Sequence, residues 1–143
     1  MEEKDLKCII FVSSAIKEIT PIEIKAWANQ AGELNAALDI SHLTIFANGN
    51  VLGLLEGPAE VVDNRFDELK RHPSHHSIIK ILSTRINYRS FEGFPFVLKV
   101  FGTEQFRALD DFRTEQMKEY FEEFLDLDSP VSNAVRNFIK SNT

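Results

Sequence analysis

The sequence predicts an α+β fold, because a short apolar run, an amphipathic helical segment and a hairpin signal follow one another along the chain. Residues 8–12 are apolar and do not alternate with polar residues, which is typical of a short strand covered on both faces. A helix start follows at Thr20, and Asn48-Gly49 is a strong short-range hairpin signal. A strand, a helix and a hairpin in this order indicate a sheet that carries helices.

The first helix is predicted from its start. Thr20 suits the cap position, Pro21 suits the first helical position, and Glu23 completes a capping box with Thr20. Apolar residues then recur at helical spacing and predict the face that packs on the sheet: Ile24, Trp27, Ala28, Ala31 and Leu34.

The hairpin is predicted to join strands at residues 40–46 and 51–55, and Gly57-Pro58 is predicted to open a second helix. This helix has an apolar side formed by Val62, Phe66 and Leu69. Two more strands are expected at residues 78–86 and 94–101. The order β-α-β-β-α-β-β predicts a ferredoxin-like sheet with one extra strand and with two helices on one face.

The last part of the chain predicts two further helices. The first has apolar residues at Leu109, Phe112, Met117, Phe121, Phe124 and Leu125. Asp128-Ser129-Pro130 then breaks the pattern and caps the second, whose apolar stripe is Val131, Ala134, Val135, Phe138 and Ile139. We expect both helices to cover the other face of the sheet. The chain therefore divides into an α/β sandwich domain at residues 1–102 and a two-helix extension at residues 103–143, packed on the same domain.

Charge and composition argue against several classes of partner. The formal net charge is −6, with 22 acidic against 16 basic residues, which disfavours nucleic acid. No apolar run approaches the ~20 residues of a membrane span, and the start MEEKDLKC lacks the basic region of a signal peptide. We therefore expect a cytoplasmic protein with no membrane partner. The single cysteine, Cys8, is expected to be a small core residue.

The sequence contains no recognisable catalytic constellation. Ser13-Ser14 lack a Gly-x-Ser-x-Gly setting, and there is no glycine-rich phosphate loop. His72-x-x-His75-His76 has a spacing that suits zinc or copper, but no cysteine or carboxylate lies at tight spacing beside it, and the fourth histidine is the distant His42. We interpret the histidines as a cationic cluster at a helix end and predict neither an enzyme nor a metal site.

Four features occur together in this sequence. They are the strand Ile9-Ile10-Phe11-Val12-Ser13, a helix that ends near an asparagine, a hairpin whose second strand ends in Leu55-Glu56-Gly57-Pro58, and a histidine-bearing segment before the fourth strand. Together they resemble the BLUF family, blue-light sensors that bind FAD non-covalently. The resemblance covers roughly residues 6–102, and the two trailing helices are similar to those of short, stand-alone BLUF proteins.

The resemblance also implies a cofactor site. In the family, a tyrosine on the first strand bonds a glutamine on the third, and light drives electron and proton transfer through this pair to the flavin. The matching positions here are Phe11 and Gly53, so neither functional group is present. Asn35 matches an asparagine that contacts the flavin in the family. Ile24 matches an aliphatic residue that packs beside the flavin ring, and His75 matches the last residue of the family's Asp-x-Arg-His segment. These five residues form the implied slot, for which FAD binding is expected to be weak or absent.

Some of these residues also have structural interpretations. Phenylalanine in a central strand, such as Phe11, is usually a core residue. Gly53 is consistent with a bulge, with tight packing of a helix, or with a ligand cavity. Asn35 also suits a helix C-cap or a turn. Glu56 is expected to accept bonds from backbone amides near the start of the second helix.

From these residues we predict a non-enzymatic BLUF-like regulatory or protein-interaction module that has lost the flavin photocycle. It is expected to bind a protein partner or to form oligomers through the sheet face and the C-terminal helices. One alternative is a small-molecule sensor that uses the slot, widened by Gly53 and made more apolar by Phe11. Another is a blue-light photoreceptor that still binds FAD and uses a different electron donor; the remaining oxidisable rings are Trp27, Tyr88 and Tyr120.

Overall fold

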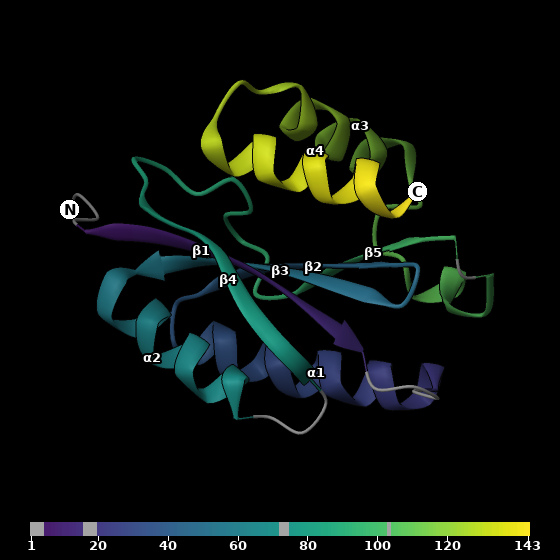
Figure 1. The fold of residues 1–143 in the computed structure, drawn as a ribbon, viewed down its shortest axis with the longest axis horizontal. Coiled ribbons are helices and arrows are strands. Elements are labelled where there is room, and N and C mark those ends of the chain that lie inside the picture. The colour runs from purple at the N-terminus through teal and green to yellow at the C-terminus, as the bar shows by residue number, and fades with distance from the viewer. Residues whose placement is uncertain (1–4, 16–19, 72–74, 103) are drawn as a thin grey trace.

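The computed structural model describes residues 5–15, 20–71, 75–102 and 104–143, which form a five-stranded sheet between two pairs of helices (Figure 1). The elements in chain order are β1 (Leu6–Ala15), α1 (Pro21–Ala37), β2 (Ser41–Ala47), β3 (Asn50–Pro58), α2 (Ala59–Lys70), β4 (His75–Arg85), β5 (Val97–Phe101), the 3-10 helix η1 (Glu104–Leu109), α3 (Glu115–Asp126) and α4 (Pro130–Asn142). The strand order is β4-β1-β3-β2-β5, antiparallel except for the parallel pair β2 and β5. The predicted ferredoxin-like sheet with one extra strand is confirmed.

Helix α1 begins at the predicted cap. The Thr20 hydroxyl accepts the Glu23 N–H at 3.2 Å, and the Glu23 carboxylate accepts the Thr20 N–H at 3.2 Å, so the capping box is confirmed. The predicted inner face is wrong at Leu34, whose side chain is 39% exposed. Asn35 is buried instead, because its amide is paired with polar groups of other elements that compensate for its loss of water.

The hairpin between β2 and β3 has the turn that its sequence predicts. Asn48 and Gly49 have φ values of 52° and 78°, and two consecutive positive values are typical of the type I′ turn that matches strand twist. β2 and β3 then pair without interruption from Ala47 opposite Asn50 to Ser41 opposite Glu56. This continuous register fixes which residues of β3 share a face.

The central strands of the sheet are buried on both faces. Alternate residues of its central strands pack in opposite directions: Ile10, Leu52 and Leu54 join the cluster formed with α3 and α4, whereas Ile9, Phe11 and Leu55 join the cluster formed with α2. Figure 1 shows α1 and α2 on one side of the sheet and α3 and α4 on the other, as predicted. Cys8 is fully buried on the α3/α4 side, and burial raises the pKa of its thiol.

The C-terminal helices differ from the prediction at their start. η1 ends at Leu109, and α3 begins only after Thr114, whose hydroxyl accepts the Met117 N–H at 3.2 Å. The expectation of one helical run from Leu109 is therefore wrong. The predicted cap of α4 is confirmed, since the Ser129 hydroxyl accepts the Ser132 N–H at 3.1 Å. Within the described ranges, no helix is both long and apolar enough to cross a membrane.

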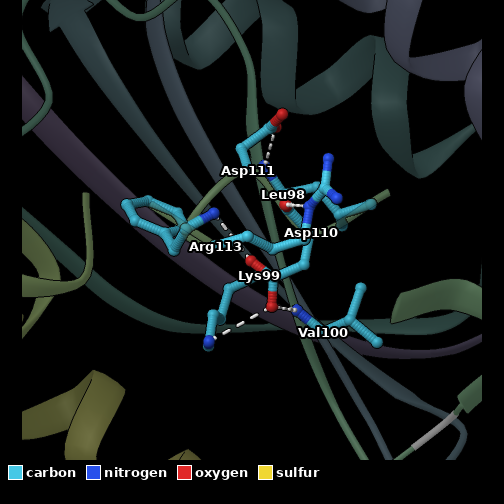
Figure 2. Close-up of polar contacts among 7 residues, drawn as sticks. Leu98, Lys99, Val100, Asp110, Asp111 and Arg113 are labelled. Atoms are coloured by element: carbon cyan, nitrogen blue, oxygen red, sulfur yellow. Dashed lines mark hydrogen bonds and ion pairs between the residues drawn. The ribbon is translucent and has the colours of Figure 1, made fainter. Parts of the chain in front are cut away.

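Two acidic residues between η1 and α3 bind the edge strand β5 (Figure 2). The Asp111 carboxylate accepts the Leu98 N–H at 2.8 Å, while the Asp111 N–H donates to the Leu98 carbonyl at 2.8 Å. The Asp110 carboxylate accepts the Val100 N–H at 3.2 Å and pairs with the Lys99 ammonium at 3.1 Å. These contacts cover the open edge of β5 and fix the point from which α3 crosses the sheet.

Candidate functional site

Three neighbouring strands bring two of the implied slot residues, Phe11 and Gly53, together with Thr44 and His42 under α1 and α2. Phe11 of β1 lies opposite Gly53 of β3, and Gly53 lies opposite Thr44 of β2. His42 is two residues from Thr44 along β2 and therefore shares its face. All four residues are buried. Phe11, Gly53 and Thr44 form a row across the centre of the sheet, and His42 is the next residue on this face of β2.

The ring of Phe11 occupies the space in which a side chain at position 53 would lie. A Cβ added to Gly53 would be 2.2 Å from Cζ, 2.5 Å from Cε1 and 2.8 Å from Cε2 of Phe11. The ring is 1% exposed and packs on the Phe66 ring at a centroid distance of 5.6 Å. Glycine is therefore required at position 53 as long as the ring keeps this place.

This contact decides among the interpretations of Gly53. β3 pairs with β1 and with β2 without a register shift at Gly53, so the bulge interpretation is wrong. The irregularity in this region lies instead between β1 and β4, at Ile10 and Phe11. The element that approaches the Gly53 backbone is the Phe11 ring, and the interpretation of Phe11 as a core residue is confirmed.

Asn35 lies at the centre of a buried polar cluster, which we call the Asn35 network: Asn35, His42, Thr44, Arg65 and the Pro95 carbonyl. The Asn35 Nδ2 lies 2.9 Å from the Pro95 oxygen and 3.0 Å from the His42 Nδ1. Arg65 Nε donates to Asn35 Oδ1 at 3.0 Å, and His42 Nε2 lies 3.1 Å from the Thr44 hydroxyl. The C-cap interpretation of Asn35 is wrong, because α1 continues past it to Ala37 and Leu38 is the C-cap.

The network fixes the orientation of the Asn35 amide. The Pro95 carbonyl can only accept and the Arg65 guanidinium can only donate, so Nδ2 must face Pro95 and Oδ1 must face Arg65. The second Nδ2 hydrogen then points at His42 Nδ1, which accepts it. His42 therefore carries its proton on Nε2 and donates to Thr44. Every hydrogen of the Asn35 amide is used within the protein.

Arg65 is a site residue that the sequence analysis did not identify. It is 7% exposed, and burial lowers its guanidinium pKa while the carboxylate of Glu68 opposes that shift. A signal was present, because Arg65 falls on the apolar stripe of α2 three residues after Val62 and four before Leu69. Charged residues on such a stripe are rarely buried unless they are paired.

A groove of about 230 Å³ lies between α1 and α2, above the Asn35 network. Its walls are Trp27, Gln30, Ala31 and Leu34 of α1 and Arg65, Glu68 and Leu69 of α2. Neither Phe11 nor Gly53 lines this groove. It is smaller than the ~300–1,000 Å³ of typical small-molecule and cofactor pockets.

The other two implied slot residues are not placed at this groove. Ile24 is buried in a cluster with Phe46, Val51, Leu98 and Phe106, and it lines a separate groove of about 430 Å³ between α1 and η1. His75 begins β4, but its side chain lies outside the described part of the structure, as do residues 72–74. In the described part, the structure therefore brings Phe11, Gly53 and Asn35 to one region and assigns Ile24 to another.

Glu56 binds a different segment from the one predicted. Its carboxylate accepts the Ser90 N–H at 2.7 Å and the Phe91 N–H at 2.9 Å, in the loop between β4 and β5, rather than amides at the start of α2. The Tyr120 hydroxyl of α3 donates to the Ser90 carbonyl. Burial raises the pKa of Glu56, although the Ser90 and Phe91 amides act in the opposite direction. Glu56 thus links β3 to the loop on which α3 rests.

The described side chains do not assemble a metal site. Among them, no group of three histidine, cysteine, aspartate or glutamate residues is suitably placed. His42 is engaged in the Asn35 network, and the side chains of His72, His75 and His76 lie outside the described part.

A family described as sensors of blue light using FAD, BLUF, matches residues 6–96. Among curated proteins, the photoactivated adenylate cyclase subunit beta of Euglena longa is 22% identical over 89 residues, which are 62% of this chain and 10% of that protein. The chain therefore spans about a tenth of this curated relative.

Solved structures with similar folds include BlrP1 of Klebsiella pneumoniae in complex with calcium and cyclic diGMP. Its TM-score is 0.71 at 20% identity, covering 94% of this chain and 34% of that one. The BLUF part of BlrP1 has a TM-score of 0.67 at 22% identity and covers 96% of this chain and 88% of that one. BlsA in its photo-activated state has a TM-score of 0.65 at 16% identity and covers 87% of this chain and 97% of that one. These likenesses show the fold.

Proposed function

The chain belongs to the BLUF family of sensors of blue light using FAD, and we propose that it is a regulatory or protein-interaction module that has lost the flavin photocycle. The contact between Phe11 and Gly53 carries this proposal. The family chemistry needs a phenol that can be oxidised and an amide that can reorient. A phenyl ring and a glycine supply neither a donor nor an acceptor at these positions.

The Asn35 network is a second argument against flavin binding in the manner of the family. A flavin edge that took the Asn35 amide would compete with His42 and Pro95, which use both of its hydrogens, and with Arg65, which uses one of the two acceptor sites of its oxygen. Each buried group left unpaired would cost about 1–3 kcal/mol. The residues therefore do not fit FAD in that arrangement, and we assign no step of the function to it.

The proposed partner surface comprises α3, the loop before β5 and the exposed side of the edge strand β4. The central strands are covered on both faces. The edge strand β4 leaves Ile79 58% exposed and Ile81 44% exposed, so a contact through the sheet is expected at this strand. Tyr88 is 63% exposed and Leu127 is 41% exposed, and both line a groove of about 220 Å³ that also contacts Tyr120. A cytoplasmic protein partner or a second copy of the chain is the proposed occupant.

The proposal is tested by reconstitution with FAD followed by illumination. The protein is refolded or expressed with FAD in excess, desalted, and its absorption spectrum is recorded before and after blue light. We expect no retained flavin band and no light-induced red shift. The BLUF part of BlrP1, treated in the same way, is the positive control because BlrP1 has been solved with FMN. A retained flavin whose band shifts on illumination would overturn the proposal.

A further inference from the structure

We propose that the groove between α1 and α2 binds a small aromatic carboxylate, with Arg65 as the residue that recognises the carboxylate. The groove combines an almost fully buried guanidinium with apolar walls. An ion with a flat apolar body matches both features.

The guanidinium of Arg65 has unused donors. Its Nε donates to Asn35 Oδ1 at 3.0 Å, and its Nη1 lies 3.9 Å from the Glu68 carboxylate, which is beyond hydrogen-bond distance. Within the described part of the chain, Nη2 has no hydrogen-bond partner. A guanidinium side chain that is 8% exposed would normally have its donors paired, so this edge is suited to an acceptor from outside the chain.

The geometry of arginine selects the kind of acceptor. The two terminal nitrogens form a planar fork that binds the two oxygens of one carboxylate with parallel hydrogen bonds. Because Nε remains on Asn35, such a ligand would add bonds to the Asn35 network without breaking any. The buried network below the groove therefore holds the guanidinium in position for the ligand.

The walls of the groove select the body of the ligand. Trp27, Ala31, Leu34 and Leu69 present hydrocarbon around the guanidinium. Leu34 is a large apolar side chain left 39% exposed in the free protein, and a bound ring would cover it. A volume of about 230 Å³ suits a single aromatic ring and not a dinucleotide.

Glu68 opposes the proposed ligand. Its carboxylate is 48% exposed and lies on the same side of α2, so it repels a second carboxylate at Arg65. Removing this charge should strengthen binding, whereas a site that is merely a packing defect would not respond. An increase in affinity on removal of the Glu68 charge therefore distinguishes recognition of an anion from general apolar contact.

The test uses Trp27, the single tryptophan of the chain, as an internal reporter. Flavin-free protein is titrated with benzoate, and tryptophan fluorescence is followed. We expect a saturable change, and we expect benzamide, which has the same ring without the charge, to bind at least about tenfold more weakly. Equal binding of the two compounds, or no saturable change with benzoate, would overturn the inference.

Variants assign the effect to Arg65. We expect Arg65→Gln to weaken benzoate binding at least about tenfold and Glu68→Gln to strengthen it. Arg85→Gln removes an arginine that is 65% exposed on β4 and should leave binding unchanged. If Arg65→Gln destabilises the fold, the inference is still tested by the affinity of Glu68→Gln for benzoate and by the comparison of benzoate with benzamide. Unchanged binding in Arg65→Gln, or weaker binding in Glu68→Gln, would contradict the inference.

The inference rests on the proposed function in one respect, because the groove must be free of flavin. The two failures are distinguishable by the absorption spectrum of the same preparation. If the protein contains no flavin and does not bind benzoate, only the proposed carboxylate site is overturned. A protein that retains FAD with a light-induced shift overturns the proposed function.

Discussion

The two faces of the sheet are held by different kinds of interaction. The face under α3 and α4 is filled with aromatic rings, such as Phe91 against Phe124 at 4.8 Å and Phe112 against Phe121 at 4.9 Å between centroids. The face under α1 and α2 buries the Asn35 network beside the Phe11 ring. One face therefore depends mainly on filled volume, and the other depends also on hydrogen-bond geometry. A hydrophobic core needs only filled volume, so the face with the buried hydrogen-bond network, under α1 and α2, is where function is expected.

The largest expected effect is on the α3/α4 face. Phe124→Ala should lower the free energy of unfolding by about 3–5 kcal/mol, because it removes a buried ring that contacts Phe91 and Phe121. Denaturant titration measures this change. A loss below about 1 kcal/mol would mean that the helices are only loosely packed on the sheet.

The α1/α2 face is tested by Asn35→Leu, which keeps the approximate size and removes the amide. Arg65, His42 and the Pro95 carbonyl would lose their partner, at about 1–3 kcal/mol for each group that stays buried. Leu34→Asn, one residue earlier on the exposed side, should cost less than about 1 kcal/mol. Equal stability of Asn35→Leu and the unmodified protein would show that this face, too, depends only on volume.

Gly53→Ala should cost about 1–3 kcal/mol, because the added Cβ collides with the Phe11 ring. In a Phe11→Ala background the same substitution should cost nearly nothing, so a double-mutant cycle measures the coupling. Gly32→Ala is the matched control, since its Cβ would meet Phe96 at an ordinary 3.6 Å and alanine favours the helix. Additive costs for Phe11 and Gly53 would contradict the proposed contact.

The smallest effect is expected at Glu56, in the pH dependence of stability. Burial raises the pKa of Glu56 in the folded protein, so protonation of Glu56 stabilises the folded state relative to the unfolded state. This contribution to the free energy of unfolding is fully present below the pKa of glutamate in the unfolded chain, about 4.3. It is lost as the pH rises through the raised pKa. The free energy of unfolding relative to Glu56→Gln should therefore fall with rising pH over that window. If the difference in the free energy of unfolding between the protein and Glu56→Gln stays constant or increases with pH, the prediction is contradicted.

Most of the fold follows from local signals in the sequence. The capping box at Thr20, the Asn48-Gly49 turn and the Ser129 cap each act within a few residues, and all three are confirmed. The start of α3 could not be placed, because Asp110 and Asp111 interrupt the apolar spacing to bind β5, a contact between different elements.

The site was only partly predictable. The resemblance identified Phe11, Gly53 and Asn35, but the contact of the ring with the glycine depends on the register between β1 and β3. Asn35 and Pro95 are 60 residues apart in the chain, so no local pattern reports their hydrogen bond. Arg65 offered a weak signal, since it interrupts an apolar stripe, yet a long side chain at that position often reaches solvent.

The most direct test of the account is whether the Phe11 ring stays on Gly53 when FAD is offered. Nuclear Overhauser effects between the Phe11 ring protons and the Gly53 α protons report this contact in solution. We predict that they are strong without FAD and unchanged when FAD is added in excess. Loss of these effects on addition of FAD, together with new contacts from the flavin ring to Asn35, would contradict the account.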